Sequence, residues 1–132
     1  MTNGTHPSPS LDETEAVAAQ GATGRRITLS HIKNNIADVR FIVPGDVLKL
    51  KRLDDPLRRL TLCLITTRSG FCVVGKSGAI DPRNFDAEKG KTFAYEDAVK
   101  QLWPMFAFSE LERQAVLDHA RSAPVQSEGG PL

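Results

Sequence analysis

The chain has 132 residues, and its 17 basic and 16 acidic side chains leave a formal net charge of +1. A charge this close to zero gives no electrostatic reason to expect nucleic acid or a membrane surface as the partner. The sequence lacks the roughly 18 consecutive apolar residues of a membrane span, and its first 24 residues lack the features of a signal peptide. We therefore expect one small cytoplasmic domain with a modest core.

Both ends of the chain are polar and rich in Pro, Gly and Ser. Such segments bury too little apolar surface to offset the entropy lost on ordering. Residues 1–24 and 122–132 are therefore predicted to be disordered tails around a single domain at 25–121. Ser10 and Glu13 have capping-box spacing, but the helix that they would open is too short to persist alone.

The first predicted elements are a helix and a strand. Residues 29–37 carry apolar side chains at spacings of three and four, and Thr28 can cap the helix that this pattern predicts. The β-branched and aromatic residues at 39–43 favour a strand, which the turn residues at 44–46 end. Residues 47–59 mix leucine with lysine and arginine, and we predict a basic loop there.

Two β-rich runs, residues 60–67 and 71–76, flank a short turn that contains Gly70. This pattern is typical of an antiparallel β-hairpin. Cys63 and Cys72 lie in these runs, and a tight turn would offset them along the ladder. We therefore expect two buried thiols and no disulfide.

The rest of the domain is predicted to be helical. Asn84 or Asp86 can cap the next helix, and Pro104 is expected to end it. A second capping box, starting at Ser109, predicts a last helix over residues 111–120. The predicted fold is therefore α+β, a small three-stranded antiparallel sheet with flanking helices in the order αβββαα.

The stretch from residue 60 to residue 104 carries the spacing of a known family. Its matching residues are Leu60-Thr61-Leu62-Cys63, Gly70-Phe71, Val73-Val74-Gly75, Asp81-Pro82, Asn84-Phe85-Asp86, Ala94-Tyr95-Glu96 and Leu102-Trp103-Pro104. This pattern resembles an uncharacterised family of small tailed-phage proteins of the podovirus type. The resemblance implies a phage or prophage origin and a compact accessory protein, and it implies no particular enzymatic activity.

Residues 70–77 match the P-loop pattern G-x-x-x-x-G-K-[ST] letter for letter. A P-loop needs a flexible loop after a strand, with a helix N-terminus behind it. Here residues 71–74 favour a strand, and the segment 78–82 is unsuited to begin a helix. We therefore interpret the match as coincidental.

The best candidate ligand site is the loop that leads into the helix after Asp86. Its amide groups and basic side chains can hold an anion or a nucleotide phosphate. The alternative, which we favour, is that these polar residues cap the helix and tie the turn. The candidate ligand-binding residues are Lys76, Ser77, Asp81, Arg83, Asn84 and Asp86.

Basic residues in the predicted loop can track a phosphate backbone, but no aromatic side chain interleaves them for stacking on bases. A patch that docks on an acidic host protein fits better, and nucleic-acid binding is the third choice. The candidate partner-binding residues are Lys49, Lys51, Arg52, Arg58 and Arg59. No metal site, cofactor or catalytic residue is predicted, because metal-ligand spacing and a nucleophile elbow are both missing.

These features favour a non-enzymatic phage or prophage protein that binds a host bacterial protein and modulates it. The alternative is a protein that binds or sequesters a small anionic ligand such as a nucleotide. The predicted first strand also has an open edge, through which a homodimer can pair.

Overall fold

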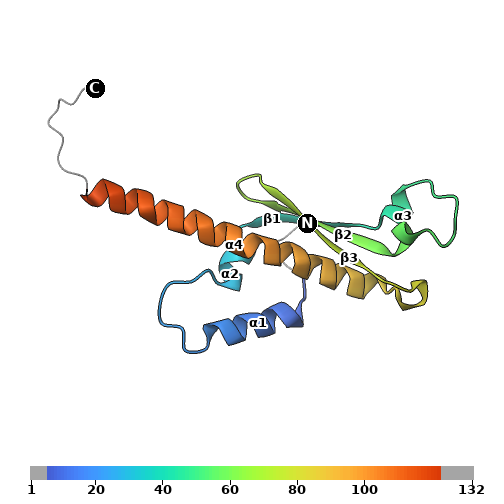
Figure 1. The fold of residues 1–132 in the computed structure, drawn as a ribbon, viewed down its shortest axis with the longest axis horizontal. Helices are drawn as coiled ribbons and strands as arrows, with labels where there is room; N and C mark the ends of the chain where they lie inside the picture. Colours follow the sequence, from blue (N-terminus) through green and yellow to red (C-terminus); the bar gives the residue numbers. More distant parts are fainter. Residues whose placement is uncertain (1–5, 123–132) are drawn as a thin grey trace, which may run out of the picture.

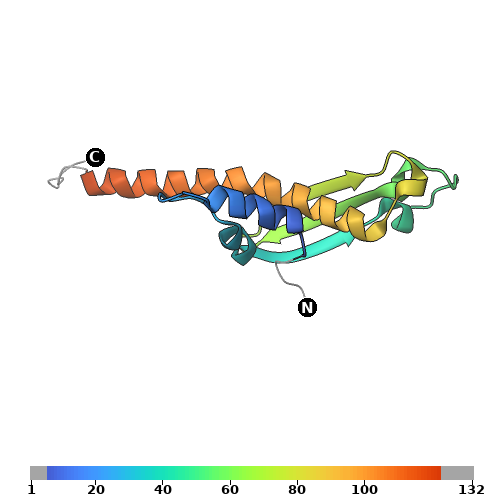
Figure 2. The same ribbon diagram turned by 90° about the horizontal axis from the view of Figure 1, so that it is seen from below.

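The computed structural model describes residues 6–122 and contains one three-stranded antiparallel sheet. Its strands are β1 (Ile36–Ile42), β2 (Leu60–Thr67) and β3 (Cys72–Gly78), with β2 in the centre. The long helix α4 (Ala87–Ser122) packs against the sheet and extends well beyond it (Figure 1, Figure 2). The predicted α+β class and the antiparallel sheet with flanking helices are confirmed.

Shorter helices complete the described chain. They are α1 (Pro9–Ala19), α2 (Leu29–Asn34) and α3 (Pro44–Val47), with 3-10 turns η1 (Pro56–Arg59) and η2 (Pro82–Asn84). Thr28 caps α2 as predicted, and its side chain accepts a hydrogen bond from the amide of His31 at 3.0 Å. The helix ends before residue 37 because β1 already begins at residue 36. The predicted loop is found at residues 48–55, whereas Val47 ends α3 and residues 56–59 form η1.

The core lies between the sheet and α4. Alternate residues of β2 are buried, which is the period of two expected for a strand with one well-covered face. Cys63 and Ile65 of β2 form one cluster with Tyr95, Val99 and Leu102 of α4. All five side chains are fully buried.

The two cysteines differ in burial. Cys63 is buried, as predicted, but Cys72 is exposed, so the prediction of a second buried thiol is wrong. The register explains the difference, because Cys72 pairs with Thr66 on the less covered face of the sheet, whereas Cys63 pairs with Gly75. Both thiols are free, as expected from their offset along the ladder.

The backbone of α4 comes very close to β3 at Gly75. A Cβ atom there would lie 2.1 Å from the carbonyl oxygen of Ala94 and 2.5 Å from the amide nitrogen of Ala98. Real Cβ atoms do not approach other atoms so closely. The absence of a side chain at residue 75 therefore sets how closely the helix packs on the sheet.

Side chains of α4 also occupy the outer edge of β3. Asp97 accepts a hydrogen bond from the amide of Lys76 at 2.9 Å, and Gln101 donates one to the carbonyl of Val74 at 2.7 Å. Backbone groups that are already bonded are poor templates for another strand. The other edge of the sheet is β1, the strand through which the sequence predicts a homodimer to pair.

The N-terminal segment corrects one prediction. Residues 9–19 form α1, although the whole stretch before residue 25 is predicted to be disordered. Leu11 is fully buried in the core, and the hydroxyl of Ser8 donates to Glu96 of α4 at 2.9 Å. An isolated helix of this length is marginal in water, so its contacts with the domain supply the stability. Most of the predicted C-terminal tail, residues 123–132, lies outside the described residues, as do residues 1–5.

The last two predicted helices are a single helix, because Pro104 lies inside α4 and does not end it. An internal proline costs about 3 kcal/mol through a lost hydrogen bond and a steric clash. Tertiary contacts beside the proline offset this cost. Trp103 donates from Nε1 to the carbonyl of Ile27 at 2.9 Å, Leu102 is fully buried, and Phe106 packs against the core.

An ion pair ties α1 to the segment before α2. Glu15 accepts two hydrogen bonds from the guanidinium of Arg26, at 2.7 and 3.1 Å, and one from the amide of Leu29 at 3.2 Å. The hydrogen bonds from Arg26 hold the pKa of Glu15 below its usual value. The resulting stabilisation is fully present above the unfolded-state pKa of about 4.3, and it is lost as the pH falls through the lower folded-state pKa.

We expect Glu15→Gln to reduce the free energy of unfolding by about 1 kcal/mol at pH 7. At about pH 3 the difference in free energy of unfolding between wild type and variant should be smaller, because protonation removes the same charge from wild-type Glu15. Urea unfolding followed by circular dichroism at both pH values measures this gap. Glu13→Gln, at an exposed position of the same helix, is the control. A gap that does not change with pH would contradict the assigned ion pair.

Candidate binding site

A pocket of about 330 Å³ opens where the β2–β3 hairpin meets the start of α4. The sheet contributes two hydroxyl groups to its lining, those of Thr61 and Ser77. These residues are directly paired in the β2–β3 register and therefore share one face of the sheet. Thr61 is fully buried, and its Oγ1 has no hydrogen-bond partner in the part of the chain that the structure describes.

The first turns of α4 form another side of the pocket. Asp86 caps the helix, because its carboxylate accepts hydrogen bonds from the amides of Glu88 and Lys89 at 3.0 and 3.1 Å. Gly90 lies directly against Thr61, where an added Cβ would be 2.6 Å from the threonine Oγ1. Glycine at this position brings the helix onto the sheet and covers the hydroxyl.

Aromatic and cationic side chains complete the lining. Phe85 and Phe93 provide the aromatic surface, and Phe93 is 54% exposed. Arg59 and Lys89 each bring a positive charge. The guanidinium of Arg59 is anchored, because its Nε donates to the carbonyl of Ala79 at 2.6 Å.

Half of the predicted ligand-binding residues line this pocket. Lys76 does not line it, because side chains alternate along β3 and Ser77 takes the pocket face. Asp81 and Arg83 are engaged with each other, through hydrogen bonds of 2.6 and 3.1 Å that hold the pKa of Asp81 below its usual value. The predicted residues that do line the pocket are Ser77, Asn84 and Asp86.

Thr61, Lys89 and Phe93 are among the pocket residues that the ligand-site prediction missed. A signal for Thr61 is present in the sequence, because the predicted hairpin turn places it opposite Ser77. Lys89 and Phe93 follow Asp86 by three and seven residues, which puts all three on one face of a helix. The two-residue period of a strand and the 3.6-residue period of a helix, applied to the sequence on either side of the predicted loop, identify Thr61, Lys89 and Phe93.

The P-loop match is coincidental, as predicted. Residues 72–77 of the motif lie within β3, where a P-loop requires an irregular loop. Gly75 faces the backbone of α4 and leaves no space there for a phosphate. The glycine and the lysine of the motif therefore have structural positions in a strand.

The predicted basic patch divides into three parts. Lys49, Lys51 and Arg52 are exposed in the loop between α3 and η1. Arg58 holds this loop together, because its guanidinium donates to two of the loop's backbone carbonyls at 2.8 and 3.3 Å. Arg59 belongs to the pocket.

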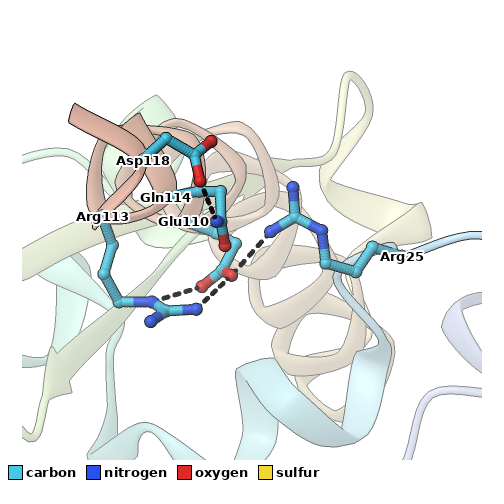
Figure 3. A network of polar contacts seen from close by, with 5 residues as sticks. All are labelled: Arg25, Glu110, Arg113, Gln114 and Asp118. Atoms are coloured by element: carbon cyan, nitrogen blue, oxygen red, sulfur yellow. Dashed lines mark hydrogen bonds and ion pairs between the residues drawn. The ribbon is translucent and has the colours of Figure 1, made fainter. Parts of the chain in front are cut away.

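The C-terminal half of α4 has a polar face. Figure 3 shows Glu110 between two arginines, accepting from Arg113 at 2.7 Å and from Arg25 at 2.8 Å. On the same side, Gln114 donates to Asp118 at 2.8 Å. These contacts hold the polar side chains of this half against one another and, through Arg25, to the segment before α2.

A different face of the same helical segment is apolar and exposed. Phe108 is 66% exposed, Leu111 62% and Val116 67%. At 100° per residue, most apolar residues of this segment lie on the side away from Glu110, although the exposed Leu117 lies on the Glu110 side and Leu111 borders the Arg25–Glu110 pair. We call the following residues the α4 apolar face: Met105, Phe108, Leu111, Ala115 and Val116.

Two buried groups that serve as nucleophiles in other proteins are held neutral. Burial raises the pKa of the Cys63 thiol and that of the Tyr95 hydroxyl to about 12. Within residues 6–122, no three or more His, Cys, Asp or Glu side chains are placed to hold a metal ion. Over the same range, no helix is long and apolar enough to cross a membrane.

Residues 27–114 match the phage protein (N4 Gp49/phage Sf6 gene 66) family. The matched stretch begins just before α2 and ends within α4, so it includes the whole sheet and the pocket. No curated protein and no solved structure matches the chain. Because the match spans more than half of the 132 residues and agrees with the resemblance seen in the sequence, the chain belongs to the phage protein (N4 Gp49/phage Sf6 gene 66) family.

Proposed function

We propose that this protein is a non-enzymatic phage accessory protein that acts in the host cytoplasm and docks on a host protein through the α4 apolar face. The observation that carries the proposal is the exposure of Phe108, Leu111 and Val116, each more than three-fifths exposed on one helical segment. Contiguous apolar surface of this kind on a small domain marks an interaction site. Membership of a phage family supports a partner from the host cell.

The arrangement suits recognition of a helix by a groove. Phe108, Leu111 and Ala115 follow the spacing i, i+3, i+7, with which an amphipathic helix enters an apolar groove. Contacts around Glu110 order the polar face of the same segment. A segment that is already ordered loses less entropy on binding. The proposed occupant is therefore a host protein with an apolar groove.

The basic loop gives a second contact to the same partner. Lys49 and Lys51 are exposed, and their loop lies at the opposite end of the molecule from the α4 apolar face (Figure 1). Exposed charges change association rates and salt dependence more than they change affinity. We propose that this loop steers the protein towards an acidic region of the host protein.

We expect Phe108→Glu to weaken binding to the host protein at least tenfold, because it places a charge in the centre of the apolar contact. Candidates are captured from host lysate with the full chain, and each enriched protein is then purified and titrated by calorimetry. Leu117→Glu adds the same charge on the side of α4 that carries Glu110 and should bind as the wild type does. Lys49→Glu combined with Lys51→Glu should slow association at low salt and have little effect at high salt.

Two results would overturn this proposal. One is a purified partner that binds the Phe108→Glu variant as tightly as the wild type. The other is a dimer of the chain alone, seen by sedimentation equilibrium and lost in Phe108→Glu, because the occupant of the face would then be a second copy.

A further inference from the structure

We infer that the pocket between the β2–β3 hairpin and the start of α4 binds a small ligand of the nucleoside monophosphate class. This inference does not depend on docking to a host protein. The pocket lies at the first turns of α4, whereas the α4 apolar face lies in the C-terminal half of that helix (Figure 1).

The first argument is the hydroxyl of Thr61. The residue is fully buried, yet its Oγ1 has no hydrogen-bond partner within residues 6–122. Buried polar atoms are almost always hydrogen-bonded, and one left unpaired reduces stability. Ser77 places a second hydroxyl beside it on the same face of the sheet. The turn of α4 at Gly90 covers the Thr61 hydroxyl, so a ligand oxygen that supplies the missing partner has to displace that turn.

The second argument is the charge around the pocket. Arg59 and Lys89 bring two positive charges to its lining, and Asp86 brings one negative charge that two amides of α4 already hold. The carboxylates of Asp54 and Asp81 also interact electrostatically with Arg59. Each of these two is paired with its own arginine, at 2.9 and 2.6 Å. A phosphate in the pocket therefore meets net positive charge.

The third argument is the aromatic surface and the size of the pocket. Phe93 is half exposed on the pocket lining, where its ring can stack on a base, and Phe85 lines the same pocket. Asn84 offers both a donor and an acceptor to a base edge or a ribose. The volume of about 330 Å³ is at the lower end of the range for small-molecule sites, roughly 300–1,000 Å³. This size is sufficient for one mononucleotide.

Calorimetric titration of the full chain with AMP, GMP, CMP and UMP tests the inference. Adenosine and inorganic phosphate are titrated separately, because each contains only one part of the proposed ligand. We expect at least one monophosphate to bind with a Kd below about 1 mM, and at least tenfold more tightly than either half.

Three variants locate the site. Thr61→Val removes the unpaired hydroxyl and keeps the shape of the side chain, so it should raise the Tm of the ligand-free protein while weakening binding at least tenfold. Lys89→Gln, at an exposed position, should weaken binding to a similar extent without unfolding the domain. Lys76→Gln makes the same change outside the pocket lining and should leave the affinity unchanged.

The inference is overturned if none of the four monophosphates binds at a concentration of about 5 mM, well above the expected Kd. It is also overturned if Lys76→Gln abolishes binding and Lys89→Gln does not. Inorganic phosphate binding as tightly as the nucleotides would refute the assignment to nucleoside monophosphates.

Discussion

Gly75→Ala is expected to destabilise the domain by about 3 kcal/mol or more, at the upper end of the usual cost of overpacking. The atoms nearest to the added Cβ are the carbonyl oxygen of Ala94, at 2.1 Å, and the amide nitrogen of Ala98, at 2.5 Å. Both belong to the backbone of α4, so no side-chain rotation relieves the contact and the helix must move. That movement would also strain the hydrogen bonds of Asp97 and Gln101 to the edge of β3.

Urea unfolding followed by circular dichroism measures this effect. Gly78→Ala is the matched control, because it lies in the same strand and its added Cβ would have its nearest neighbour at 3.8 Å. We expect the control to remain within about 1 kcal/mol of the wild type. Equal stability of the two variants would mean that α4 does not cross β3 as closely as described.

Leu11→Ala is expected to reduce the free energy of unfolding by about 2–5 kcal/mol, the range for deleting a fully buried leucine. Val17→Ala in the same helix is the control, because Val17 is 65% exposed and its loss should cost little. Thermal and urea unfolding of both variants measure the difference. If both variants behaved like the wild type, α1 would contribute nothing to the core, and the segment would match the disordered tail predicted from the sequence.

The hairpin and the first helix were predictable because local signals determine them. Gly70 has a φ of +93°, a left-handed conformation that glycine adopts without strain, and the β-rich runs on either side of it pair across this turn. Thr28 caps α2 through its own side chain. Where interactions lie within a few residues of one another, the sequence alone is sufficient.

Local rules failed at α1 and at Pro104, where distant contacts outweigh local preferences. The buried Leu11 and the hydrogen bond from Ser8 to Glu96 stabilise a helix that is too short to persist alone. Trp103 and its neighbours hold the helix through Pro104 by bonding and packing to segments far away in the sequence. The predicted burial of Cys72 is wrong for the same reason, since only the packing of α4 decides which face of the hairpin is covered.

The candidate pocket was found only in part from the sequence. Ser77, Asn84 and Asp86 were predicted because they lie close together in the sequence. Thr61 comes from a different strand, and its hydroxyl is significant only because it is buried without a partner in the described chain. Burial is a property of the packed structure, so residue type and spacing alone do not reveal it.

By itself the sequence determined the α+β class, the antiparallel hairpin, the phage family and the rejection of the P-loop match, because these depend on local conformational preference and on recognisable spacing. Only the tertiary structure decided that α1 joins the core, that α4 is one continuous helix, and that a pocket and an exposed apolar face lie on different parts of that helix. The physical reason is that burial, close backbone approach and paired charges arise between segments far apart in the chain, whose relative placement is set by packing.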